Sequence, residues 1–127
     1  MLLVEVLLAD AVAQVVAYAL KQAIGRERPP AIWATPKPLV GVPHDGSFPS
    51  GHAASSFACA TVLAFALPRQ AWALFLLAAA IAWSRVYVGV HFPLDVLAGA
   101  ALGVLVAIAL RMLSAALRRS RPATRAG

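Results

Sequence analysis

Four apolar segments, each close to the length that crosses a lipid bilayer, restrict the fold of this chain more than any other feature. They cover residues 2–20, 50–67, 71–90 and 94–117. About 20 helical residues span a hydrocarbon core of roughly 30 Å, and a helix satisfies every backbone polar group internally. With 61% hydrophobic and 13% charged residues among 127, the chain has more apolar surface than a soluble domain buries. We therefore predict an all-α integral membrane bundle with four transmembrane helices.

The connection between the first two segments differs from the spans in composition. It covers residues 25–49, is rich in proline and glycine, and is too polar to cross a membrane. Loops of this length are uncommon unless they are functional or disordered. We predict that this loop carries part of a functional site. Residues 1–117 then form the membrane domain, and residues 118–127 form a disordered basic cytoplasmic tail.

Alternating helix directions bring the polar ends of all four segments to one side of the membrane. That side receives Lys21, Arg26, Arg28, Ser50, His52, Ser84, Arg85, His91 and Asp95. The other side receives Arg69, Arg111, Arg118, Arg119, Arg121 and Arg125. Cytoplasmic loops of membrane proteins are enriched in Lys and Arg, so we predict cytoplasmic termini and an extracytoplasmic polar cluster. The net charge of +6 then indicates a juxtamembrane tail and no nucleic-acid partner.

Three cations in the polar cluster indicate an anionic ligand. Lys21 and Arg28 are seven residues apart, which places them on one face if the first helix continues through both. Arg85 adds a third positive charge, and arginines with a lysine suit phosphate. The alternative for each of them is a side chain that reaches from a span end to the interface.

The segment "PSGH", residues 49–52, adds backbone donors to this cluster. Ser50 is a suitable N-cap, and Gly51 lets the main chain approach a ligand closely. Free N–H groups at the start of a helix attract anions. His52 lies in the first turn, so a titratable ring is placed beside the predicted anion site.

His91 and Asp95 are four residues apart at the start of the last span. A carboxylate on one imidazole nitrogen fixes the tautomer and makes the other nitrogen a better nucleophile. One histidine can then attack phosphorus while the other protonates the leaving oxygen. A metal site built on His52, His91 and Asp95 is the less favoured alternative, because the nearby cations repel a metal ion.

Three stretches resemble the signature motifs of the type 2 phosphatidic acid phosphatase superfamily: "KQAIGRERP" (21–29), "PSGH" (49–52) and "SRVYVGVHFPLD" (84–95). This superfamily comprises the lipid phosphate phosphatases, and vanadium-dependent haloperoxidases share its site. The resemblance implies that His91 is a nucleophile forming a phosphohistidine, Asp95 its orienting partner and His52 the general acid. It implies phosphate binding by the remaining motif residues, with no metal or cofactor: Lys21, Arg28, Ser50, Gly51 and Arg85.

The resemblance also implies a lipid phosphate or diphosphate as substrate. "HDGSFPSGH" is similar to the corresponding stretch of bacterial undecaprenyl-diphosphatases, so undecaprenyl diphosphate is the favoured substrate. His44 and Asp45 in this stretch either tune the head-group site or, as we favour, are solvated loop residues. Phosphatidic acid and phosphatidylglycerophosphate stay open as substrates, and a homodimer stays open as the assembly.

Two other functions stay open. Membrane members of the family usually have more spans before the first motif, so this chain is N-terminally short relative to them. A non-catalytic, truncated membrane component is therefore an alternative. A vanadate-dependent oxidase is a second alternative, but such relatives are soluble, and the apolar spans argue against it.

Overall fold

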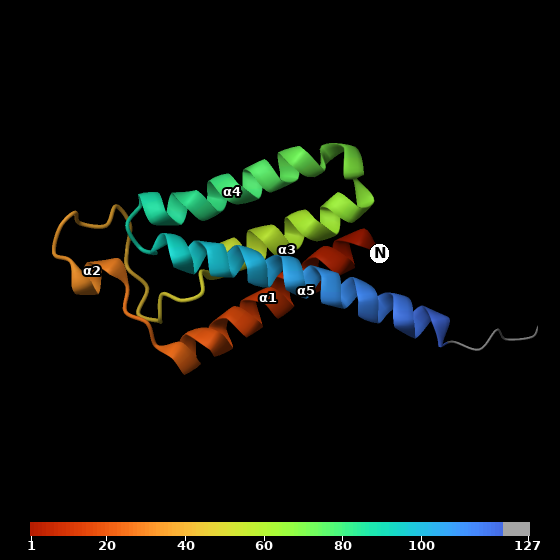
Figure 1. Cartoon of the computed structure of the whole chain (residues 1–127), viewed down its shortest axis with the longest axis horizontal. Coiled ribbons are helices and arrows are strands. Elements are labelled where there is room, and N and C mark those ends of the chain that lie inside the picture. Colours follow the sequence, from red (N-terminus) through yellow and green to blue (C-terminus); the bar gives the residue numbers. More distant parts are fainter. Residues whose placement is uncertain (121–127) are drawn as a thin grey trace, which may run out of the picture.

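The computed structural model describes residues 1–120, in which the regular elements are helices and no strand occurs (Figure 1). The chain forms α1 (Leu2–Ile24), α2 (Pro29–Ile32), α3 (Gly51–Ala66), the 3-10 turn η1 (Pro68–Gln70), α4 (Ala71–Tyr87) and α5 (Pro93–Arg119). The predicted all-α membrane bundle is confirmed. Three helical stretches, Leu2–Ile32, Pro68–Tyr87 and Pro93–Arg119, are long and apolar enough to cross a membrane. The chain is thus a multi-pass membrane protein. The helix α3 is shorter than these stretches: its 16 residues make it about 24 Å long.

Glycine and proline set the ends of the helices. Gly25 ends α1 with φ 62° and ψ 28°, and its N–H donates to the carbonyl of Lys21 at 2.9 Å. This left-handed conformation carries no steric penalty in glycine and closes the helix. The condition for Lys21 and Arg28 to share a helix face, that one helix continues through both, is not met, because the chain turns at Gly25. Pro93 starts α5 at its first position, where a missing N–H costs nothing.

Small residues let α3 lie at the centre of the bundle. The buried alanines Ala9, Ala13 and Ala17 of α1 share a core cluster with Ala54 and Ala58 of α3. On the other side, a Cβ added to Gly99 of α5 would lie 2.3 Å from the carbonyl oxygen of Ser50. Side chains this small allow backbones to approach closely, which is how helices associate in lipid.

All the polar helix ends lie at one end of the bundle, as alternating helices predict. Figure 1 shows the C-terminal ends of α1 and α4 and the N-terminal ends of α3 and α5 beside the loop that carries α2, with the N-terminus of the chain at the opposite end. At that opposite end, α5 continues to Arg119. Arg118 and Arg119, the first two residues of the predicted tail, therefore lie in the last turn of α5. The rest of the predicted tail, residues 121–127, lies outside the described residues.

Candidate active site

Hydrogen bonds to backbone carbonyls hold the long loop over the polar end of the bundle. The N–H of Ser47 donates to the carbonyl of Arg26 at 2.8 Å, and its hydroxyl donates to the carbonyl of Glu27 at 3.0 Å. The N–H of Ser50 donates to the carbonyl of Asp95 at 2.8 Å, which ties the start of α3 to the start of α5. The loop between α1 and α3 thus has a defined position relative to the helices that carry the candidate residues.

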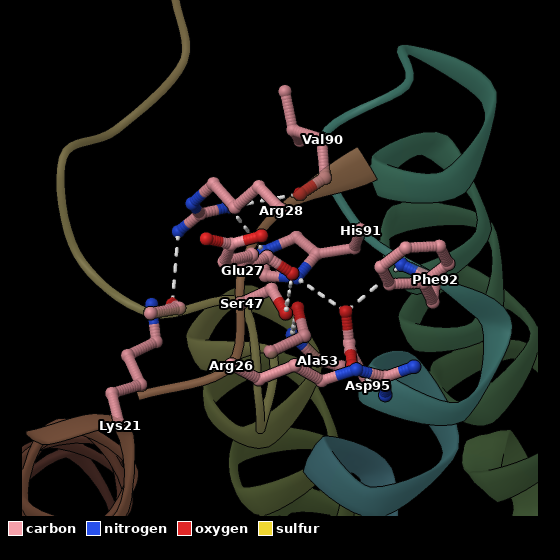
Figure 2. Close-up of polar contacts among 12 residues, drawn as sticks. Lys21, Arg26, Glu27, Arg28, Ser47, Ala53, Val90, His91, Phe92 and Asp95 are labelled. Atoms are coloured by element: carbon pink, nitrogen blue, oxygen red, sulfur yellow. Dashed lines mark hydrogen bonds and ion pairs between the residues drawn. The ribbon is translucent and has the colours of Figure 1, made fainter. Parts of the chain in front are cut away.

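Arg28 lies at the centre of the site and is only 4% exposed. Its Nη1 donates to the carbonyl of Val90 at 2.9 Å and lies 3.2 Å from His91 Nε2 (Figure 2). An arginine has no acceptor atoms, so His91 Nε2 accepts this hydrogen bond. The proton of the neutral ring must then be on Nδ1, the nitrogen on the side of Asp95.

Asp95 lies behind His91 and is fully buried. Its Oδ2 is 3.5 Å from His91 Nδ1, at the outer limit of hydrogen-bond length, and accepts the N–H of Phe92 at 2.9 Å. Nδ1 has no closer hydrogen-bond partner within residues 1–120. Catalytic hydrogen bonds are often long without substrate and shorten in the complex. The arrangement orients the ring so that Nε2 faces the cations.

Arg26 holds the other carboxylate oxygen of Asp95, a contact that the sequence analysis missed. Arg26 Nη1 lies 2.7 Å from Asp95 Oδ1, and its guanidinium stacks over the ring of Phe92 at 4.5 Å from the centroid. A carboxylate that is buried away from water needs such a partner to offset its lost hydration. The sequence shows Arg26 two residues before Arg28. It does not show that Arg26 pairs with Asp95, which is 69 positions away.

Asp45 is the second residue whose place the sequence analysis did not predict. Its carboxylate oxygens lie 2.7 Å from Lys21 Nζ and 2.7 Å from Arg28 Nη2, and its carbonyl accepts from Arg28 Nε at 3.0 Å. The favoured interpretation of Asp45 as a solvated loop residue is therefore wrong. The carboxylate links two of the three predicted phosphate-binding cations.

A cavity of about 230 Å³ is lined by residues of α1, α3 and α4, of the long loop and of the turn before α5. Its lining includes Gln14 of α1, Gly51 and His52 of α3, Arg85 of α4 and His91. The Nε of Arg85 is buried and has no hydrogen-bond partner among residues 1–120. Ser50 does not line this cavity. It caps α3, because its hydroxyl accepts the N–H of Ala53 at 3.4 Å. We call Lys21, Arg28 and Arg85 the cation cluster below.

Burial and charge set the ionisation of two groups in the site. Burial lowers the pKa of His91 to about 4, helped by the Arg28 guanidinium and opposed by Asp95. Partial burial raises the pKa of Asp45, but the bonds from Lys21 and Arg28 outweigh it and hold that pKa below its usual value. His91 is therefore a neutral base at neutral pH, and Asp45 is an anion.

The set of side chains fits an anion better than a cation. Within residues 1–120, no group of three or more His, Cys, Asp or Glu side chains is placed to hold one metal ion. The two carboxylates near the cavity, Asp45 and Asp95, both pair with cationic side chains. A neutral imidazole nitrogen beside three cations can attack an electrophilic, negatively charged group that those cations bind.

Comparison with known proteins identifies related chains. Residues 2–119 match the family model described as the PAP2 superfamily. A protein of Sulfolobus acidocaldarius named undecaprenyl-diphosphatase is 48% identical over 62 residues, which cover 48% of this chain and 30% of that protein. A Mycobacterium tuberculosis protein named decaprenylphosphoryl-5-phosphoribose phosphatase is 36% identical over 114 residues, 87% of this chain and 60% of that protein.

A solved structure has the same arrangement of helices. The crystal structure of a transmembrane PAP2-type phosphatidylglycerolphosphate phosphatase from Bacillus subtilis has a TM-score of 0.69 and 30% identity. The match covers 91% of this chain and 60% of that one. Across the three proteins, this chain spans 30% to 60% of their length.

Proposed function

Because the chain belongs to the PAP2 superfamily, we propose that it is a metal-independent membrane phosphatase that hydrolyses a lipid phosphate or diphosphate. The reaction transfers the phosphoryl group to His91 and then to water. Undecaprenyl diphosphate is the substrate we favour. This choice rests on the motif stretch before His52 and on two relatives whose names refer to polyprenyl lipids.

One observation carries the proposal: His91 Nε2 faces the cation cluster, with Arg28 Nη1 at 3.2 Å, while Asp95 lies behind Nδ1. This tautomer leaves the Nε2 lone pair available once a ligand engages Arg28. A neutral nucleophile oriented by a carboxylate is the arrangement that nucleophilic catalysis by histidine requires.

The first step forms the bond between His91 Nε2 and phosphorus and breaks the bond between phosphorus and the lipid oxygen. Lys21, Arg28 and Arg85 stabilise the charge on the equatorial oxygens, with the backbone N–H of Gly51 at the start of α3. The imidazolium formed at His91 keeps its Nδ1 proton beside Asp95. The products of this step are a phosphohistidine and either the lipid alcohol, from a monophosphate, or the lipid monophosphate, from a diphosphate.

His52 supplies the proton that the leaving oxygen requires. It lies in the first turn of α3 and lines the same cavity as His91. In the second step, neutral His52 takes a proton from water, which attacks phosphorus and releases inorganic phosphate. The two imidazoles then return to their starting states.

The site opens where a membrane-embedded lipid can present its head group. Apolar helices enter the bilayer directly below the cavity, since α3 begins at Gly51 and α5 at Pro93. We propose that this face is extracytoplasmic and both termini cytoplasmic. Once the cation cluster is set aside for phosphate binding, Arg26 and Lys37 are the basic residues left on this side, against six arginines on the other. An outward site fits the recycling of a lipid carrier released outside the cytoplasm.

Phosphate release by the detergent-purified chain tests this function. Undecaprenyl diphosphate, phosphatidic acid and phosphatidylglycerophosphate are compared with EDTA present, and His91→Ala is the control. We expect turnover of at least one lipid, fastest for undecaprenyl diphosphate, and none in the variant. Full activity in His91→Ala contradicts the mechanism. No turnover by a folded wild-type chain favours a non-catalytic component.

A further inference from the structure

We propose that Asp45 is an internal competitor for the phosphate site and thereby sets which anions the site accepts. Its carboxylate holds positions on Lys21 and Arg28 that a substrate phosphate needs. Both contacts measure 2.7 Å, the length of charge-assisted hydrogen bonds. The inference depends on the proposed function only for the identity of the anion.

Arg28 has no free donor while Asp45 is bound. Its Nε donates to the Asp45 carbonyl, and its Nη2 donates to Asp45 Oδ1 and to the carbonyl of Gly46 at 3.3 Å. Its Nη1 faces the carbonyl of Val90 and His91 Nε2. An anion that binds Arg28 next to Nε2 must therefore displace a partner. The carboxylate is the partner that another anion replaces without loss of charge pairing.

The Asp45 side chain has room to leave its position. It lines the 230 Å³ cavity with His91, and it also lines a neighbouring cavity of about 410 Å³ that includes Gln22, Arg26 and His44. The side chain is 29% exposed. A change of rotamer is enough to move a carboxylate between adjacent spaces.

The loop keeps its anchors when the carboxylate moves. Arg28 Nε binds the backbone carbonyl of Asp45, and Ser47 binds the carbonyls of Arg26 and Glu27. None of these contacts uses the Asp45 side chain. Exchange of the carboxylate for phosphate thus needs no unfolding of the loop.

Competition of this kind gives selectivity. A monovalent carboxylate on a ligand gains little by replacing Asp45, because it makes the same two contacts. A phosphate dianion has more charge and a third oxygen, so it can also reach Arg85, whose Nε is buried and unpartnered in the described chain. Asp45 therefore admits phosphate groups, rejects carboxylate head groups and helps to expel the inorganic phosphate product.

Calorimetric titration of inorganic phosphate into the detergent-solubilised full chain tests the inference. The variants are Asp45→Asn and Asp45→Ala, and Glu27→Gln is the matched control. Glu27 has an exposed side chain on the same loop, so its substitution removes one negative charge without opening the cation cluster. We expect on the order of tenfold tighter phosphate binding in both Asp45 variants and less than a twofold change in Glu27→Gln.

Unchanged or weaker phosphate binding in folded Asp45 variants overturns the inference, because Asp45 then only positions the cations. An equal gain in Glu27→Gln also overturns it, since the cause is then net charge. Absence of phosphate binding in all variants does so too. Tighter binding without lipid turnover by any variant supports the inference while refuting the proposed function, so the two failures are distinguishable.

Discussion

Replacement of Gly99 by alanine is expected to disturb the site through one short contact between α5 and α3. The added Cβ would lie 2.3 Å from the carbonyl oxygen of Ser50, with Ala53 Cβ at 3.0 Å and Ala54 N at 3.2 Å. An ordinary carbon–oxygen contact is about 3.3 Å, so the helices must separate here by about 1 Å. Ser50 moves away from Asp95, whose carbonyl accepts the Ser50 N–H at 2.8 Å.

A displacement of about 1 Å in the cap of α3 moves Gly51 and His52 relative to His91. Misplacement of that size costs on the order of 10²-fold in rate, whereas overpacking costs about 1–3 kcal/mol of stability. Gly103→Ala is the matched control, because its Cβ would lie 2.1 Å from the carbonyl oxygen of Ala54, one turn farther from the site. We expect it to destabilise the bundle at least as much but to lower kcat less than tenfold.

The assay pairs phosphate release with thermal unfolding. Reaction of Cys59, the single cysteine, with a thiol-reactive fluorophore reports unfolding in detergent. The reasoning is refuted if folded Gly99→Ala retains the wild-type kcat. It is also refuted if the two alanine variants lose kcat equally, since a general loss of stability then explains both.

Three other outcomes follow from the site. In a His44→Gln/His52→Gln variant, His91 is the remaining histidine, and NMR titration of its ring is expected to give a pKa near 4. The ring is then neutral above that pH and charged below it, and a titration midpoint near 6.5 contradicts the assigned burial. Arg26→Gln is expected to lower kcat about tenfold or more with little change in KM, because Asp95 loses its 2.7 Å partner, and Arg26→Lys should restore part of kcat; a change in KM alone would place Arg26 on the substrate instead. Ser50→Ala is expected to destabilise the chain by about 1 kcal/mol, measured by thermal unfolding, and no change would mean that the 3.4 Å cap bond contributes nothing.

The sequence predicted the spans well because their signals are local. The predicted segments 50–67 and 71–90 correspond to α3 (Gly51–Ala66) and α4 (Ala71–Tyr87). Pro68 and Pro93 mark boundaries that no neighbouring residue can override, since proline lacks the N–H that a helix interior needs. The first segment was predicted to end at residue 20, but α1 continues to Ile24 because Lys21 and Gln22 are good helix formers.

The partners of the polar residues were harder to predict than their location. Connectivity alone places Lys21, His52, Arg85 and His91 at one end of the bundle. The pairing of Asp45 with Lys21 and Arg28 depends on how the 25–49 loop folds back, and loops lack the periodicity from which helices are read. The ion pair between Arg26 and Asp95 depends in the same way on the turn at Gly25. The roles assigned to these residues in catalysis stay predictions.

Trapping of a phosphoenzyme tests most directly the central claim that His91 is the nucleophile. The wild-type chain is mixed with lipid diphosphate labelled with ³²P at the terminal phosphate, quenched in alkaline detergent, in which phosphohistidine survives, and digested for mass spectrometry. The account predicts label and added phosphate mass on His91 and none in His91→Ala. Phosphate on another residue, or turnover by His91→Ala at the wild-type rate, would contradict it.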